Sequence, residues 1–225
     1  VGPPHIRFYA GYPLQLPDGL RVGSFCLVAP EPRGFTPDEI AVLKDFAAIV
    51  EDEFAAISAA TTDDLTGLFN RRGFNNLGKY AITSARRRAE PLTLAWLDLD
   101  KFKNINDTFG HEEGDNALRA MANLLRDSFR EADLLIRYGG DEFLIVLTEL
   151  NEADSLRIAE RIRRRVEKIK VTSPDGDLIP LSLSIGVAMF NGHPDYERLI
   201  QAADEALYGA KRRGRNCVEL WKATL

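Results

Sequence analysis

The residues best suited to chemistry are two acids at a glycine pair: Asp141 and Glu142 directly follow Gly139 and Gly140. An apolar run stands on each side of these four residues, which predicts a hairpin, because tight two-residue turns need positive φ. The turn would hold both acids beside backbone without side chains, where a cation or a phosphate can approach closely. Read alone, the stretch is equally typical of a plain surface hairpin with solvated acids.

Another acid ends an apolar strand, since Asp98-Leu99-Asp100 follow the nearly all-apolar residues 92–97. An acid at the end of a buried strand is costly unless a cation or hydrogen bonds compensate it. If this strand neighbours the hairpin, Asp98 meets Asp141, and carboxylates with backbone carbonyls form a hard-oxygen site suited to Mg²⁺. Mg²⁺ keeps positions for phosphate oxygens and favours displacement at phosphorus. A helix cap or a loop acid is the alternative for this pair.

Directional polar groups crowd residues 101–115, which we interpret as a loop and the entry to a helix. An Asn and an Asp facing one purine could read guanine, with the carboxylate accepting from N1 and N2 and the amide meeting O6 and N7. Near the other end of the chain, Lys211 and Arg215 lie four apart around Gly214, and such a cationic pair could hold a triphosphate. Cations at a helix C-terminus followed by glycine would explain the same residues without a ligand.

The elements that must position these residues follow the order βαββαβ, with a helix and a strand added. This order predicts an α+β, ferredoxin-like (split βαβ, palm-type) domain in which the first strand and the hairpin lie side by side in a central antiparallel sheet. We expect strands at 92–99, 134–138, 143–147, 181–190 and 216–220, and helices through 74–85, 113–130, 153–169 and 196–213.

Ahead of this domain, residues 5–10 and 22–28 are strand-like around a turn at 16–19, and a helix is expected over 36–62. Thr36 and Glu39 form a capping box around Pro37. The helix has apolar residues at alternating gaps of three and four, which favours a parallel two-stranded coil and a homodimer; a helix packing on its own sheet is the alternative. The seam consists of Ile40, Leu43, Ala47, Val50, Phe54 and Ile57.

Composition indicates a soluble globular protein: 45% of the 225 residues are hydrophobic and 28% are charged. The net charge of -5 argues against a nucleic-acid binder but not against a nucleotide substrate. Cys26 and Cys217 are far apart, which predicts buried, reduced thiols and a cytoplasmic protein. No apolar run reaches membrane-spanning length. The start at residues 1–4 without Met predicts a fragment of a longer protein.

Two known families resemble parts of this chain. Residues 5–14, 23–27 and 32–33 resemble the C-terminal part of a GAF sensor domain, whose ligand the sequence does not reveal. From Asp63 to about Leu220 the chain resembles the GGDEF domain of diguanylate cyclases, so we divide it into 1–35, 36–62 and 63–225. The second resemblance rests on six ordered motifs: Asp63-x-Leu65-Thr66-Gly67-Leu68-x-Asn70-Arg71-Arg72, Asp98-x-Asp100-x-Phe102-Lys103-x-x-Asn106-Asp107, Gly110-His111-x-x-Gly114-Asp115, Arg137-Tyr138-Gly139-Gly140-Asp141-Glu142-Phe143, Ser184-Ile185-Gly186-Val187-Ala188, and Ala206-Leu207-Tyr208-x-Ala210-Lys211-x-x-Gly214-Arg215-Asn216.

The GGDEF resemblance implies an enzyme that joins two GTP into cyclic di-GMP across a homodimer. It also implies product inhibition at Arg130-x-x-Asp133, with Arg161 supplied by a neighbouring domain. A non-catalytic effector that binds GTP or cyclic di-GMP, and a mononucleotide cyclase of related fold, are the alternatives. The implied site comprises Asp98, the Leu99 carbonyl, Asp141 and Glu142 for Mg²⁺ (or Mn²⁺), Asp141 with Glu142 for catalysis, Asn106 and Asp115 for guanine, Phe102, Lys103, His111, Gly139 and Gly140 around the nucleotide, and Lys211 and Arg215 for phosphates.

Overall fold

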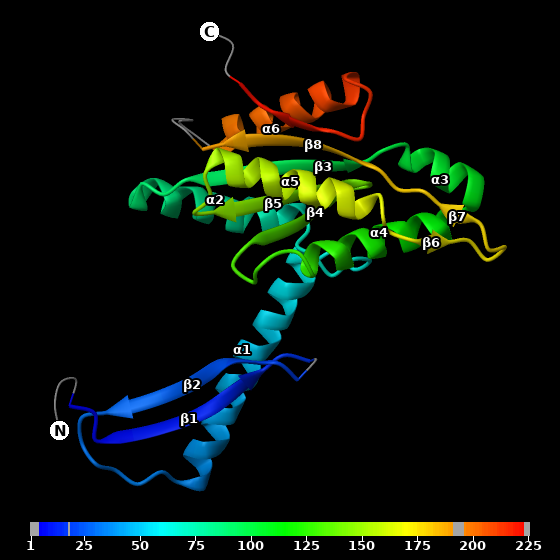
Figure 1. Ribbon diagram of the computed structural model, residues 1–225. Coiled ribbons are helices and arrows are strands. Elements are labelled where there is room, and N and C mark those ends of the chain that lie inside the picture. Colours follow the sequence, from blue (N-terminus) through cyan, green and yellow to red (C-terminus); the bar gives the residue numbers. More distant parts are fainter. Residues whose placement is uncertain (1–4, 18, 191–195, 223–225) are drawn as a thin grey trace. The chain divides into compact units, whose positions relative to one another are not determined.

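A computed structural model describes residues 5–17, 19–190 and 196–222 of the chain (Figure 1). The chain forms two units, residues 1–60 and 61–225, and each is described by itself. The expected turn residue Asp18 and the opening residues 1–4 lie outside the described residues. Within the described residues, no helix combines the length and the apolar character needed to cross a membrane.

The N-terminal unit contains an antiparallel pair of strands, β1 (Phe8–Gln15) and β2 (Arg21–Ala29), and the helix α1 (Pro37–Thr61), which ends at the unit boundary. The expected capping box is confirmed: the Thr36 amide donates to Glu39 Oε2 at 2.9 Å, and the Glu39 amide donates to Thr36 Oγ1 at 3.3 Å. Both cysteines are free, but the prediction of buried thiols is wrong for Cys26, which is exposed on β2, and Cys217 is only partly buried.

The heptad seam of α1 divides into two parts. Leu43 and Ala47 are buried, whereas Phe54 is 43% exposed and Ile57 is 50% exposed. The hairpin packs against the helix, since the Gln15 amide donates to Glu51 Oε1 at 2.7 Å and the Phe25 ring lies 6.2 Å from that of Phe46. The prediction of one continuous intermolecular seam is therefore wrong for Leu43 and Ala47, which are buried in their own chain.

The C-terminal unit is built on a five-stranded sheet in the order β4-β5-β3-β8-β9. Each neighbouring pair among the first four strands is antiparallel, whereas β9 runs parallel to β8, so the sheet is mixed. The order of the first four confirms the split βαβ plan, with β3 central and β4 at an edge. The strands are β3 (Leu92–Leu99), β4 (Leu134–Gly139), β5 (Glu142–Thr148), β8 (Leu183–Met189) and β9 (Val218–Leu220).

Helices cover both faces of this sheet. Successive residues of a strand point to opposite faces, so the wholly buried strand β3 presents side chains to a core on each side. On β3, Leu97 packs in one apolar core with α4 and α5, and Trp96 packs in the other with α2 and α6. In Figure 1, α3 lies beyond the end of β3. The helices are α2 (Arg71–Arg88), α3 (Phe102–Phe109), α4 (His111–Arg126), α5 (Glu152–Val166) and α6 (Tyr196–Arg212).

Three local expectations need correction. Residues 102–109 form the helix α3 rather than a loop, because Lys101 (φ 58°) and Gly110 (φ 92°) turn the backbone sharply at its two ends. The helix expected over 113–130 ends at Arg126, so Arg130 lies beyond it. Two short paired strands, β6 (Val171–Thr172) and β7 (Leu178–Ile179), form in a segment where the sequence pattern predicts no strand.

Candidate active site

A tight turn forms at the glycine pair, but it lies one residue later than expected, because Gly139 still belongs to β4. Gly139 pairs with Glu142, so Gly140 and Asp141 are the two central residues of the hairpin. Gly140 has a φ of 52°, which glycine adopts without steric cost. Both glycines are exposed, and a methyl group placed on either would meet no atom within 4 Å. A ligand can therefore approach this backbone closely.

Arg137 links this turn to Asp63 through hydrogen bonds. Arg137 Nε donates to the Gly140 carbonyl at 3.0 Å, and its Nη1 lies 3.1 and 3.2 Å from the two carboxylate oxygens of Asp63. Asp63 also accepts from the amide and the hydroxyl of Thr66. Burial opposes ionisation of Asp63, but the hydrogen bonds from Thr66 and Arg137 prevail and lower its pKa. The sequence predicted no role for Asp63 or Arg137.

The two strands that carry the acids lie side by side. Asp98 on β3 is directly opposite Glu142 on β5, and the Leu99 amide donates to the Asp141 carbonyl at 3.2 Å. Asp98 is almost fully buried, with 9% of its side chain exposed. Burial raises the pKa of Asp98, with Asp141 adding repulsion, and burial together with the charge of Asp98 raises the pKa of Glu142. Excess negative charge is thus concentrated at this end of the sheet.

A lysine partly neutralises that charge. Lys211 Nζ, at the end of α6, lies 2.6 Å from Asp98 Oδ2. Lys211 was expected at the phosphates, so its contact with an expected metal ligand is a departure from the sequence interpretation. Among the described residues, no group of three Asp, Glu, His or Cys side chains converges on one point. The carboxylates of Asp98, Asp141 and Glu142 all lie at this end of the sheet, and such oxygen atoms are the hard donors that small divalent cations prefer.

The expected guanine-reading residues lie at the corner between α3 and α4. The Asn106 side chain lies against Gly114, where a methyl group would stand 1.8 Å from Asn106 Oδ1 and 3.2 Å from Phe102 Cζ. Gly114 is therefore what lets Asn106 lie beside the first turns of α4, where Asp115 is partly exposed. The other two expected nucleotide contacts, Lys103 and His111, are exposed on the same two helices.

Asp100, two residues after Asp98, is bound by hydrogen bonds from distant parts of the chain. Asp100 is buried and accepts from Ser182 Oγ at 2.9 Å, Ser184 Oγ at 2.6 Å and the Asn216 amide at 3.0 Å. The bond from the Asn216 amide ties it to the loop after α6, where Arg215 is exposed. The sequence could have suggested Asp100 only as an acid near a strand end, because its partners lie 82 to 116 residues away.

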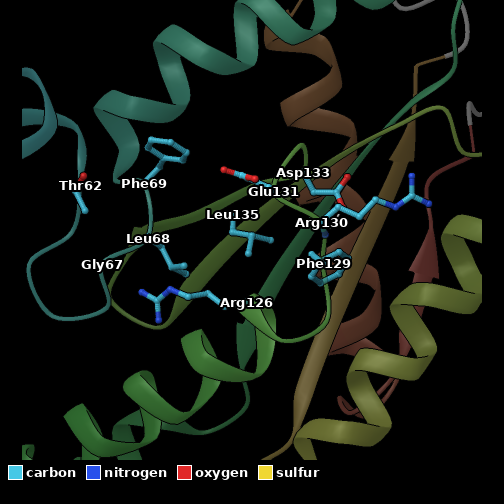
Figure 2. A pocket seen from close by; sticks show the side chains of 10 residues that line it. All are labelled: Thr62, Gly67, Leu68, Phe69, Arg126, Phe129, Arg130, Glu131, Asp133 and Leu135. Atoms are coloured by element: carbon cyan, nitrogen blue, oxygen red, sulfur yellow. Dashed lines mark hydrogen bonds between the residues drawn. The ribbon is translucent and has the colours of Figure 1, made fainter. Parts of the chain in front are cut away.

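A separate pocket of about 360 Å³ lies by the expected inhibitory motif. Figure 2 shows Arg130 and Asp133 on one side of it and Arg126 on another. The Arg130 amide donates to Asp133 Oδ2 at 3.1 Å, and burial raises the pKa of Asp133 against the opposing effect of Arg130. Arg161 is exposed on α5 and is not among the described residues that line this pocket.

Comparison with known proteins gives a consistent result. A family model described as diguanylate cyclase, GGDEF domain, matches residues 60–217. The diguanylate cyclase DosC of Escherichia coli (strain K12) is 60% identical over 163 residues, which cover 72% of this chain and 35% of DosC. The response regulator PleD of Caulobacter vibrioides (strain NA1000 / CB15N) is 42% identical over 165 residues, covering 72% and 36%. The chain thus spans about a third of the length of these relatives.

Solved structures share the fold. The coiled coil and GGDEF domain of DgcB from Caulobacter crescentus, in complex with c-di-GMP, matches with a TM-score of 0.73 and 32% identity, over 80% of this chain and 98% of that chain. The GGDEF domain of TpbB from Pseudomonas aeruginosa matches with a TM-score of 0.67 and 39% identity, over 72% of this chain and 94% of that chain.

Proposed function

This chain belongs to the GGDEF-domain family of diguanylate cyclases, and we propose that it condenses two molecules of GTP into cyclic di-GMP and two pyrophosphates. One observation carries the proposal: Asp98 and Glu142 lie opposite one another on adjacent strands, beside an open Gly-Gly turn. Two acids with raised pKa values at a backbone without side chains form a place where metal-bound phosphates can sit.

In this proposal, different residues bind the guanine base and the phosphates of GTP. Asn106 and Asp115, at the corner of α3 and α4, read the guanine, and Phe102, Lys103 and His111 line the nucleotide. Gly139 and Gly140 admit the phosphates to the turn, and Lys211 and Arg215 hold them by charge-assisted hydrogen bonds. In this scheme Lys211 leaves Asp98 when nucleotide and metal arrive, because its ammonium then has phosphate oxygens as partners.

Members of this family use divalent metal ions, and we propose Mg²⁺, with Mn²⁺ as a substitute. Asp98, Asp141, Glu142 and the Leu99 carbonyl would hold it. When bound, such an ion neutralises charge on the phosphates during displacement at phosphorus. In this proposal Asp141, at the turn, helps to take the proton of the 3′-hydroxyl, and Glu142 keeps the surrounding charge negative.

The reaction requires two copies of the domain, because each site holds one GTP and each 3′-hydroxyl attacks the α-phosphate of the partner's GTP. We therefore propose a homodimer, with the exposed second half of the α1 seam, Phe54 and Ile57, contributing to it. The N-terminal hairpin and helix would be the end of a GAF-like sensor that responds to a ligand still to be found. A cytoplasmic location, where GTP is available, stays a prediction.

Product analysis tests the main proposal. The protein is incubated with GTP and Mg²⁺, and the products are separated by chromatography, with ATP as the control nucleotide. We expect cyclic di-GMP and pyrophosphate in a 1:2 ratio from GTP. Binding of GTP or cyclic di-GMP without turnover would instead identify a non-catalytic effector, and a cyclic mononucleotide would identify a different cyclase.

We also propose that the product inhibits the enzyme at the pocket beside Arg130 and Asp133. Arg130 can reach a guanine edge or a phosphate with its planar fork, and Asp133 can accept from guanine N1–H and N2–H₂. Arg161 would come from a neighbouring domain, since it does not line this pocket. The same pocket holds Phe129 and Leu135, which offer apolar surface to a base.

Steady-state inhibition tests this second proposal. Cyclic di-GMP is titrated into assays of the parent and of Arg130→Ala, with Glu131→Ala as a neighbouring control. We expect non-competitive inhibition of the parent and of the control, and a weaker effect on Arg130→Ala. Coinciding curves for parent and Arg130→Ala, or inhibition purely competitive with GTP, would remove the site from this pocket.

A further inference from the structure

Three consecutive residues after α6 have positive φ: Gly214 at 111°, Arg215 at 67° and Asn216 at 48°. Glycine adopts this region freely, but side-chain-bearing residues adopt it rarely, and two in succession are held there only by their surroundings. Arg215 is one of these residues and is the proposed phosphate ligand. Whatever fixes this backbone therefore fixes the direction in which Arg215 leaves the loop.

Two sets of hydrogen bonds fix this backbone. The Arg215 amide donates to the Ala210 carbonyl at 3.2 Å, and the other bonds converge on Asn216. Its amide donates to Asp100 Oδ2 at 3.0 Å, its side-chain Nδ2 donates to Glu167 Oε1 at 2.6 Å, and its Oδ1 accepts from Arg163 Nη1 at 2.7 Å. Arg163 and Glu167 also form an ion pair with each other at 3.1 Å. The donor and acceptor capacities of the asparagine amide are thus both used, and no residue of another type presents the same pair of groups at this length.

The partners of Asn216 lie in two parts of the fold, the end of β3 beside Asp98 and the end of α5. Asp100 is two residues from Asp98 and is buried, held also by Ser182 and Ser184. Arg163 and Glu167 stand at the end of α5, which covers the opposite face of the sheet from α6. The loop carrying Arg215 is therefore anchored both to the strand end that carries Asp98 and to a rigid helix.

From these contacts we infer that Asp100, Arg163, Glu167 and Asn216 form a latch that positions Arg215 toward the triphosphate of GTP. These are positioning residues, since none of them needs to touch the substrate. The inference rests on the proposed function and adds to it a reason why the backbone beside Arg215 is strained. Misplacing a phosphate ligand by about 1 Å can cost roughly 100-fold in rate. A latch that fixes the position of Arg215 would therefore preserve the catalytic rate.

A positioning role and a merely structural role predict different effects. If the latch positions Arg215, its loss should weaken binding of the triphosphate and leave binding of the guanine base unchanged. The test uses Arg163→Met, which keeps the bulk of the side chain, and Asn216→Gly, which keeps the amide bond to Asp100 and tolerates the positive φ. Arg164→Met is the matched control, because Arg164 bonds Glu160 on the same helix and its side chain is 68% exposed. Thermal unfolding establishes that each variant is folded.

Binding is measured by calorimetry with guanosine 5′-(α,β-methylene)triphosphate and Mg²⁺, and separately with GMP. We expect both latch variants to bind the triphosphate analogue about tenfold more weakly, the size of one lost hydrogen bond to a charged group. GMP affinity should stay within about twofold of the parent, the agreement usual for sites that do not interact. Arg164→Met should match the parent for both ligands.

A double-mutant cycle with Arg215→Ala completes the test. If the latch acts through Arg215, adding Asn216→Gly to Arg215→Ala should weaken triphosphate binding little further. Parent-like binding by both latch variants, equal weakening for both ligands, or full additivity with Arg215→Ala would overturn the latch alone. A parent that binds neither ligand and makes no cyclic di-GMP overturns the proposed function, and the latch with it.

Discussion

Lys211 Nζ lies 2.6 Å from Oδ2 of Asp98, so a residue proposed to bind phosphate contacts a residue proposed to bind metal. Removing the lysine should then have two opposite effects. Lys211→Met should bind Mn²⁺ more tightly in the absence of nucleotide, because the ammonium no longer competes for the carboxylate. It should also raise the KM for GTP about tenfold or more, because a charged phosphate contact is lost.

Manganese binding followed by electron paramagnetic resonance and steady-state kinetics measure these two effects of Lys211→Met. Arg212→Met is the control, since Arg212 is exposed next to Lys211 on α6. Weaker Mn²⁺ binding by Lys211→Met than by the parent would contradict the idea that the lysine competes with the metal.

The acids at the turn and at the strand end should be indispensable for turnover. Asp141→Ala and Asp98→Asn should each reduce cyclic di-GMP formation below about 1% of the parent, the loss typical of an essential electrostatic group. Asp141 lies in a partly exposed turn, so its variant should keep the melting temperature of the parent. Chromatographic product analysis at millimolar Mg²⁺ measures this, and near-normal formation by either variant would refute the metal site.

The space left by Gly114 should govern guanine binding. In Gly114→Ala the added methyl group would stand 1.8 Å from Asn106 Oδ1, so Asn106 has to move away. We expect the KM for GTP to rise about threefold to tenfold, the value of one or two neutral hydrogen bonds. Kinetics of Gly114→Ala, Asn106→Ala and the double variant provide the measurement. The two changes should not add, and simple additivity would mean that Gly114 acts independently of Asn106.

Activity should depend on protein concentration. Specific activity should fall on dilution, because each GTP reacts with the GTP of the partner domain. Phe54→Lys should lower it further by placing a charge in the exposed half of the α1 seam. Sedimentation and activity are measured over the same concentrations, with Glu53→Lys as a control at the neighbouring position. Constant specific activity far below the measured dimer dissociation constant would count against the dimer.

Asp63 should contribute to stability in a pH-dependent way. Burial opposes its ionisation, but the bonds from Thr66 and Arg137 leave its pKa lowered. A lowered pKa in the folded state stabilises the protein above the ordinary aspartate pKa, near pH 4, and this contribution disappears as the pH falls through the folded-state pKa. Asp63→Asn should cost about 1–3 kcal/mol of unfolding free energy at pH 7.

Urea unfolding at pH 7 and at pH 3 measures this contribution. The difference between the parent and Asp63→Asn should shrink at the lower pH. Asp64→Asn, a change at the exposed neighbour, should follow the parent at both values. An Asp63→Asn deficit that is the same at pH 3 and pH 7 would show that the Asp63–Arg137 pair is not its source.

Much of the fold was predictable from the sequence, because apolar periodicity is local. The strand 92–99 and the order of the other strands and helices followed from runs and gaps of apolar residues. The capping box at Thr36 and the Gly-Gly turn followed from rules that involve neighbouring residues alone. Helix ends and the short helix α3 were missed, because positive φ at Lys101 and the early stop at Arg126 are set by packing.

The residue types available for chemistry can also be read from the chain without a structure: acids at a glycine turn, an acid at a strand end, and cations near the end of the chain. Their partners became known only from the folded chain. It places Lys211 on Asp98, Arg137 between Asp63 and the turn, and Asp100 on Asn216. These pairs are separated by 74 to 116 residues, apart from Arg137 and its turn. Which long-range partner an acid finds depends on strand order and register, and no local pattern of residues encodes that distance.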